Sequence, residues 1–324
     1  MEKVAVLDCA TYQQDLVDAA VAGVVDMLGG MGRFVRAGQR VCLKVNLVAG
    51  KAPEKCVTTN PAVVRAIAKL VVGLGATCVI ADSAGGPFTK GFMNGVYKKS
   101  GMKQVADDME GVELNQDFTS QLLPYPDGYV VKKMPVLNVL VTSDVVINLC
   151  KMKAHTFSGF TGACKNLYGA IPGLVKMHWH DHYRSIEDFS DVMLDIHGFL
   201  GDKLQLHIVD AVDAMEGKGP LGGTAKHVGL ILGSTCPHSA DVALVRLMGG
   251  QPEDFPTLSQ AVLRGHLNDG YGIEVLGTPL EDYINPEFDL QTPRAAFTFG
   301  GRAGDAVVGC ALRVRFGGKY KRTT

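Results

Sequence analysis

The sequence predicts an α/β fold, a mainly parallel sheet flanked by helices. Strand-like apolar runs alternate with helix-like runs through the first half of the chain, and strands separated by helices pair in parallel with right-handed crossovers. The 39 glycines fall in short clusters between these runs, where loops are expected. Hydrophobic residues make up 47% of the 324 residues, which is enough to form a sizeable core.

Each element of the first half follows from its local pattern. Three apolar runs have the length of buried strands: residues 4–9, 40–48 and 77–83. Helical spacing or helix-start signals mark residues 13–28, 60–74 and about 88–100. Asn60-Pro61 opens the second of these helices, with proline in the first turn. Residues 111–143 are broken by prolines, and their short alternating stretches, YVVKKM and VLNVLV, predict hairpins at a sheet edge.

The second half starts with a buried strand at 144–153, and a stretch rich in glycine and histidine follows from 154 to 182. Further strands are expected at 204–212, 227–233 and 310–316, and helices at 185–200, 239–249 and 257–267. We expect two α/β lobes, residues 1–140 and 141–316, with a site in the cleft between them and a short tail at 317–324.

Charge and cysteine content exclude several classes of protein. The 32 basic and 33 acidic residues nearly balance, which argues against nucleic-acid binding and against a polybasic membrane surface. No apolar run approaches the length of a membrane span, and no signal-peptide pattern opens the chain. None of the eight cysteines forms a CxxC pair, so no iron–sulfur cluster motif lies within this chain. We therefore expect a reduced, cytoplasmic protein with a small anionic ligand.

The richest stretch for chemistry is KMKAHTFSGFTGACKNLYGAIPGLVKMHWHDH, residues 151–182. It directly follows a buried strand, and ligands of open α/β sheets bind beyond the carboxyl ends of strands. Lys153, Lys165 and Asn166 with loop glycines are typical of an anion site, whereas His155 beside lysines is typical of a general base or a metal ligand. The alternative is a solvated basic loop.

Three histidines alternate in the HWHDH segment, at positions 178, 180 and 182. On an extended segment they would face the same way, as a zinc or nickel site requires. The alternatives are a run of surface histidines and a turn that enters the next helix. We expect a metal site that uses His155 with His178 or His180.

Polar residues at other predicted strand ends are candidate ligand contacts. Lys44 and Asn46 lie on one face of a buried strand, where ligand contact competes with a structural salt bridge. Thr59 and Asn60 precede a helix, which they could cap or whose N-terminus could hold an anion.

Two further polar groups have equally open interpretations. Asp82 and Ser83 begin a small-residue loop that could cradle a phosphate or form a tight turn. The carboxylates Asp210, Asp213 and Glu216 are spaced by three residues, which fits one face of a helix turn or a loop around a cation. The alternative for this group is a capped turn with solvated carboxylates.

Together these motifs resemble the family of the domain of unknown function 362, whose members are often iron–sulfur-associated. The resemblance runs from VAVLDC to the helix at 238–249. It rests on LKVNLV, VTTNPAVVRAI, ADSAGG, VINLCKMKAHTFSGFTGACKNLYGAIPG and VDAVDAMEGKGP, in that order. It implies a fold and a site location more than a reaction. Many members carry a C-terminal ferredoxin domain, whose cluster motifs this sequence lacks through residue 324.

More distantly, the chain is similar to the lactate racemase family, whose nickel-pincer nucleotide is tethered to a lysine and whose nickel has a histidine ligand. Here His155 precedes Lys165 by ten residues, and His180 follows Lys165 by fifteen. The resemblance implies a lysine-tethered cofactor and a transition metal at these residues. Asn60 stands where that family has an arginine, so carboxylate binding is not implied there.

The first functional hypothesis is an enzyme for a small anionic or phosphate-bearing substrate, an isomerase or oxidoreductase. His155 would be its general base or metal ligand and Lys165 its charge clamp or covalent anchor, while Lys44 and Lys153 would hold the anion. The alternative is a non-catalytic cofactor-binding or electron-transfer module coupled to an iron–sulfur domain. A third hypothesis is structural, in which the cations pair with the acidic residues at 210–216.

Overall fold

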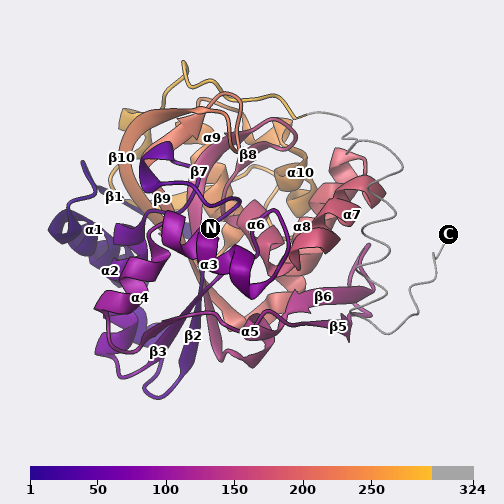
Figure 1. The fold of residues 1–324 in the computed structure, drawn as a ribbon. Coiled ribbons are helices and arrows are strands. Elements are labelled where there is room, and N and C mark those ends of the chain that lie inside the picture. Colours follow the sequence, from indigo (N-terminus) through magenta and orange to yellow (C-terminus); the bar gives the residue numbers. More distant parts are fainter. Residues whose placement is uncertain (294–324) are drawn as a thin grey trace.

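One nine-stranded sheet runs through residues 1–293, the part of the chain that the computed structural model describes (Figure 1). The strand order is β11-β1-β10-β9-β7-β2-β3-β4, and β8 pairs with β7. Neighbours are parallel from β9 through β4 and between β11 and β1, whereas β10 is antiparallel to both of its neighbours. The predicted α/β fold with a mainly parallel sheet is confirmed.

The strands of this sheet have the following bounds: β1 (Glu2–Asp8), β2 (Arg40–Lys44), β3 (Thr77–Ala81), β4 (Val112–Leu114), β7 (Val145–His155), β8 (Gly159–Thr161), β9 (Leu204–Glu216), β10 (Thr224–Ser234) and β11 (Ile273–Gly277). A separate hairpin consists of β5 (Ser120–Pro124) and β6 (Lys133–Leu137). The central strand β7 is buried along nearly its whole length, as expected for a strand covered on both faces.

The α-helices of the described residues are α1 (Gln14–Met27), α2 (Pro61–Gly73), α3 (Lys90–Lys99), α4 (Met102–Asp108), α5 (Asn138–Thr142), α6 (Ala163–Asn166), α7 (Gly173–His182), α8 (Ile186–Leu200), α9 (Pro237–Leu247) and α10 (Pro256–Leu263). In Figure 1, α1, α2 and α4 lie on one side of the sheet, and α6, α8 and α10 lie on the other. Helix α9 contacts β1, β9, β10 and α10.

Helix ends follow ordinary capping chemistry. The Asn60 side chain accepts a hydrogen bond from Ala62 N at 2.9 Å, and the Ser185 hydroxyl accepts one from Asp188 N at 3.0 Å. Pro61 occupies the first turn of α2, and Gly75 follows its end with a φ of 78°. The helices predicted at 13–28, 60–74 and 185–200 are therefore present with nearly the expected bounds.

Some expectations about single elements are wrong or fall outside the described residues. The strand predicted at 40–48 ends at Lys44, because the chain turns there toward the sheet edge. The hairpin expected within 111–143 is present as β5–β6, but 138–142 is the helix α5 rather than a strand. The glycine-rich stretch 154–182 contains β8, α6 and α7. The strand predicted at 310–316 lies outside the described residues.

The division into two lobes at residue 140 is not confirmed. Strand β2, from the first segment, pairs directly with β7 from the second, and β1 pairs with β10. Strands of both segments thus share one sheet and one apolar core. Where a domain boundary falls stays a prediction.

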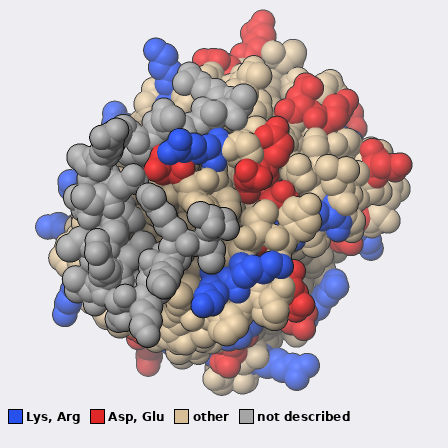
Figure 2. All heavy atoms as spheres, turned by 90° about the vertical axis from the view of Figure 1, so that its right-hand side faces the viewer, with Lys and Arg blue, Asp and Glu red and all other residues tan. Residues whose placement is uncertain are grey.

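The surface and the helices agree with the composition. Acidic and basic side chains both occur among the described residues on the face shown in Figure 2, as the near balance of charges predicts. Within residues 1–293 no helix combines the length and the apolar character that crossing a bilayer requires.

Asp195 on α8 anchors the loop that joins β5 to β6. Its buried carboxylate accepts hydrogen bonds from the backbone N–H groups of Tyr129, Val130 and Val131, all at 2.8 Å. It also pairs with Arg264 at 2.8 Å. The fully desolvated carboxylate of Asp195 therefore links α8 to the β5–β6 loop and to Arg264, which follows α10.

We expect Asp195→Asn to lower the free energy of unfolding by about 3 kcal/mol, because an amide N–H₂ cannot accept the backbone N–H groups and leaves Arg264 short of a partner. Urea unfolding of the purified chain measures this. Lys103→Gln, which breaks the exposed Lys103–Asp107 pair, is the control and should leave the midpoint unchanged. Equal midpoints for Asp195→Asn and the control would contradict the anchoring role.

Candidate functional site

The site lies where the parallel strands β2, β3, β7 and β9 end, because the carboxyl ends of parallel strands meet at one edge of a sheet. Lys44 ends β2, Asp82 follows β3, and Lys151 and Lys153 lie in the last third of β7. Asp210 comes from β9, where it is paired in register with Lys151. Five residues from four strands are thereby brought together, and all five are buried.

Lys44 and Asp82 form the first buried ion pair, with Lys44 Nζ 2.6 Å from Asp82 Oδ1. Asp82 Oδ2 accepts a hydrogen bond from Leu47 N at 2.6 Å, and Lys44 donates to Val45 O at 2.8 Å. The backbone of Gly169 covers the pair so closely that a Cβ there would lie 1.9 Å from Asp82 Oδ1. Of the two interpretations of Lys44, the structural salt bridge is what the structure contains.

Lys151 and Asp210 form the second buried pair, at 3.0 Å. The Tyr12 hydroxyl joins them: it accepts from Lys151 Nζ at 2.7 Å and donates to Asp210 Oδ1 at 2.8 Å. Asn60 N donates to Asp210 Oδ2 at 2.8 Å. Burial and the neighbouring Asp210 raise the pKa of Tyr12, which therefore stays protonated.

Lys153 is buried but has no carboxylate within ion-pair distance among residues 1–293. Its Nζ donates to Asn46 Oδ1 at 3.0 Å and to Val57 O at 2.7 Å. Burial, together with the charge of Lys151, lowers the pKa of Lys153 to about 7. This amine is therefore partly neutral near physiological pH.

Lys165 on α6 has still fewer partners. Its Nζ lies 4.5 Å from the centre of the Phe189 ring and 5.4 Å from that of Tyr168, and no described residue forms a hydrogen bond or ion pair with it. Burial and the nearby Lys176 lower the pKa of Lys165 to about 7. A lysine between aromatic rings with a depressed pKa has the properties of a nucleophilic or cofactor-bearing amine.

Lys176 on α7 is the third lysine without a carboxylate partner. Its Nζ donates to Ser83 O, and burial lowers its pKa to about 8. The Ser83 hydroxyl is buried and has no hydrogen-bond partner within the described part of the chain. Such a group is explained when a ligand or water completes the site.

The ring of His155, at the end of β7, has a defined tautomer. His155 Nδ1 accepts hydrogen bonds from Phe157 N at 3.1 Å and Ser158 N at 3.3 Å, so the proton of the neutral ring is on Nε2. Burial, followed by the charges of Lys165 and His180, holds the pKa of His155 well below its usual range. The geometry favours a hydrogen-bond donor at Nε2, because metal binding through Nε2 would require the ring to lose this proton or these contacts.

His180 stacks on Phe189 with 4.5 Å between ring centres. Burial and the charges of Lys165 and Lys176 lower the pKa of His180 to about 2. His155, Lys165 and His180 are thus close enough for their charges to interact, and these are the three residues whose spacing the sequence analysis singled out.

The prediction that the alternate histidines of the HWHDH segment face the same way is wrong. Residues 173–182 form the helix α7, so His178 and His180 point to different sides of it. His178 instead stacks against His182, one turn away, with 6.0 Å between ring centres. Metal binding by His155, His178 or His180 stays a prediction.

The expectation of a helix turn or loop for the acidic residues is also wrong, because all three lie on β9. Each has its own partner: Asp210 pairs with Lys151, Asp213 with His227 at 2.8 Å, and Glu216 with Lys226 at 3.7 Å. The structural hypothesis therefore applies to Lys151, which pairs with Asp210. Neither Lys153 nor Lys165 has a carboxylate partner among the described residues.

Thr59, Asn60 and Asn166 have structural contacts in this arrangement. The Thr59 hydroxyl bridges Leu149 O and Asn46 N, and the Asn60 oxygen caps α2, as the capping interpretation predicts. Asn166 Nδ2 donates to Asn148 Oδ1 at 2.7 Å. These side chains hold the site in shape.

Sequence reasoning did not select Tyr12, Lys151 or Lys176 as site residues. Lys151 and Lys176 stand in the basic stretch, but nothing in the sequence separates them from its other lysines. The sequence did contain a signal for Tyr12. This residue follows the carboxyl end of β1, and ligands of open α/β sheets bind beyond the carboxyl ends of strands.

Comparisons with known proteins identify a family and several similar proteins. A family model described as a domain of unknown function (DUF362) matches residues 41–246. A thylakoid-associated protein of Synechocystis sp. is 29% identical over 266 residues, which are 80% of this chain and 78% of that protein.

Two solved structures are similar at low identity. The lactate racemase apoprotein from Thermoanaerobacterium thermosaccharolyticum has a TM-score of 0.37 and 14% identity, over 70% of this chain and 54% of that one. A protein from Thermotoga maritima has a TM-score of 0.38 and 12% identity, over 69% of this chain and 56% of that one. This chain thus spans just over half the length of each of these two structures.

The paired and unpaired lysines predict opposite effects on stability. Lys165→Met removes a cation whose folded pKa lies below its unfolded value, so the wild-type protein gains stability as pH rises from about 7 toward 10. At pH 7 the variant should be more stable by about 1–2 kcal/mol, and the difference should shrink toward pH 10. Urea unfolding at both pH values measures it.

Lys44→Met is the matched comparison, because it leaves the buried Asp82 without its cation. It should lose about 3–5 kcal/mol of stability. Destabilisation of Lys165→Met to the same extent would mean that Lys165 has a partner comparable to Asp82, and the distinction between the two lysines would be lost.

Proposed function

The chain belongs to the family of the domain of unknown function DUF362, and we propose that it is an enzyme that binds a small anion at the carboxyl ends of β2, β3 and β7. The ligand would carry a carboxylate or phosphate group. The observation that carries the proposal is a surplus of lysine over carboxylate: Lys44 and Lys151 are paired, whereas Lys153, Lys165 and Lys176 have no carboxylate partner among the described residues.

Burial makes this surplus informative. An ammonium group removed from water without a counter-charge is strongly unfavourable, and it responds by losing its proton. Lys153 is fully buried, whereas Lys165 and Lys176 are partly buried, and this loss of water lowers their pKa values to about 7, about 7 and about 8. An anionic ligand would supply the missing charge and raise these pKa values again. The unpartnered Ser83 hydroxyl supports the same interpretation.

Catalysis is proposed because the amine of Lys165 is partly neutral beside a histidine of defined tautomer. A neutral lysine amine can attack a carbonyl or accept a proton, and a neutral imidazole with its proton on Nε2 can donate to a developing negative charge. Such a pair can move a proton next to a carboxylate, as isomerase and oxidoreductase reactions can use. We assign Lys165 as anchor or base, His155 as donor, and Lys153 as anion clamp.

A second candidate function uses the same amine differently. Lys165 would carry a covalently bound cofactor, held against Phe189 and Tyr168, in an accessory module that serves a partner protein. The absence of any hydrogen bond to Lys165 from the described residues favours this alternative as much as it favours a reactive base.

We expect inorganic phosphate or acetate to raise the thermal unfolding midpoint of the wild-type chain beyond sodium chloride at equal ionic strength. Lys153→Met and Lys165→Met should lose this increase, with each weakening the affinity by about tenfold or more. Lys103→Met, an exposed lysine far from the strand ends, is the matched control and should respond like wild type. An equal response in all three variants would remove the proposed site.

The affinity for acetate should depend on pH in a defined direction. Binding favours the protonated lysines, so affinity is highest below about pH 7 and falls as pH rises through the pKa of Lys153 and Lys165. Each lysine that must gain a proton contributes up to about a tenfold loss per pH unit. Isothermal titration calorimetry between pH 6 and 9 measures this, and a flat profile would contradict lysine as the anion contact.

Intact mass spectrometry separates the two candidate functions. Protein purified without chelator and without oxygen should carry a mass adduct, lost in Lys165→Met, if Lys165 anchors a cofactor. Protein of the unmodified mass that still binds acetate supports the reversible anion site instead.

A further inference from the structure

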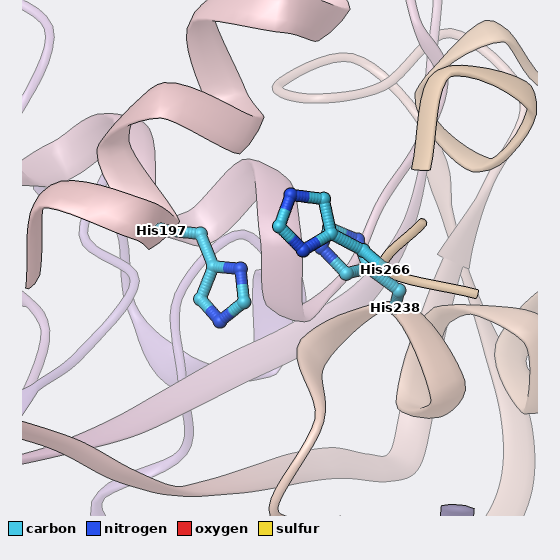
Figure 3. Close-up of side chains that lie close together, drawn as sticks. All are labelled: His197, His238 and His266. Atoms are coloured by element: carbon cyan, nitrogen blue, oxygen red, sulfur yellow. The ribbon is translucent and has the colours of Figure 1, made fainter. Parts of the chain in front are cut away.

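A second group of polar side chains lies away from the lysines, on the side of the sheet covered by α8, α9 and α10. His197 is in the last turn of α8, His238 is the second residue of α9, and His266 follows α10 (Figure 3). One ring nitrogen from each lies within 4.8 Å of the others. Three separate elements thus bring three imidazoles to one point.

Three buried ring nitrogens of this group have no hydrogen-bond partner among the described residues. His238 is fully buried, and neither its Nδ1 nor its Nε2 has a partner within residues 1–293. His197 Nδ1 is likewise buried without one. Buried polar groups are normally hydrogen-bonded, so three unsatisfied nitrogens in one cluster require an explanation.

Hydrogen bonds between the three rings do not explain the unsatisfied nitrogens. The ring centres lie 5.1–5.7 Å apart, and no imidazole–imidazole hydrogen bond forms. Each neutral imidazole keeps one lone pair, and it is the lone pairs of several imidazoles at one point that a metal ion uses.

The charged groups around the cluster keep the rings neutral. Burial and Arg264 lower the pKa values of all three histidines, to about 4 for His197, and the charges of neighbouring histidines add to this for His197 and His238. Arg264 is itself paired with Asp191 at 3.4 Å and with Asp195 at 2.8 Å. His207 also lies close enough for its charge to lower the pKa of His238. Neutral imidazole is the form that binds metals.

We propose that His197, His238 and His266 form a binding site for a divalent transition metal ion, with Zn²⁺ as the best match. Three imidazoles with one position left for water are a known zinc ligand set. Zn–N bonds of about 2.0–2.1 Å would draw the three nitrogens closer together. His197 lies in the last turn of α8, and His266 lies beyond the end of α10, so neither belongs to the sheet that a shift toward the metal would have to leave intact. This site is independent of the proposed function at Lys165.

The test uses the full-length chain, stripped with chelator and then titrated with Zn²⁺ or Co²⁺. We expect one metal ion per chain by elemental analysis, visible absorption from Co²⁺ in a nitrogen-ligated site, and a rise in the thermal unfolding midpoint. His238→Ala and His266→Ala should each weaken the affinity at least tenfold. His155→Ala, in the other site, and His227→Ala, on an exposed histidine, should bind like wild type.

If His238→Ala does not fold, His266→Ala and His197→Ala test the site instead, because their side chains are only partly buried. The apo forms are compared first by circular dichroism. Absence of metal uptake by the wild-type chain would overturn the proposal, and so would equal uptake by all variants. Loss of metal in His155→Ala alone would move the metal to the first site.

Discussion

Two buried ion pairs, Lys44–Asp82 and Lys151–Asp210, tie the carboxyl ends of four parallel strands together. Such pairs contribute little net stability compared with well-packed apolar residues, but each becomes very unfavourable once one partner is removed. They therefore act as a constraint: the backbone of Gly169, the Tyr12 hydroxyl and the start of α2 are all arranged around them. Both carboxylates are thereby engaged, and among the described residues Lys153, Lys165 and Lys176 have no carboxylate partner.

The lysine site and the histidine cluster differ in chemistry but share supports. Asp241 on α9 accepts hydrogen bonds from Ala163 N at 2.5 Å and Cys164 N at 3.0 Å, at the start of the helix that carries Lys165. His238 lies one turn earlier on α9. The first site contains lysines that have no carboxylate partner among the described residues, whereas the second contains neutral imidazoles with lone pairs. One helix thus holds a ligand of the proposed metal and anchors the start of the helix that carries Lys165.

The sequence predicted the α/β class and most strands of the sheet, and it placed several lysines near strand ends, because apolar runs and strand ends are local features of the chain. It failed where the conformation of a segment decides the outcome. Histidines at 178, 180 and 182 point one way on a strand, yet 173–182 is a helix, and the carboxylates at 210–216 lie on a strand. It also could not find the group of His197, His238 and His266, since 41 and 28 residues separate them in turn and only packing brings them together. Which lysines are paired is likewise a property of the tertiary structure.

The position of β1 has a consequence for how the chain folds. This strand lies between β10 and β11, which are among the last described elements. At roughly 5–20 residues per second, about 11–43 s of synthesis separate Asp8, at the end of β1, from Thr224, at the start of β10. During that time both edges of an apolar strand are open to pairing with other nascent chains. Pairing between segments this far apart in the sequence favours slow folding, and it leaves an apolar strand edge unpaired until its partners are made.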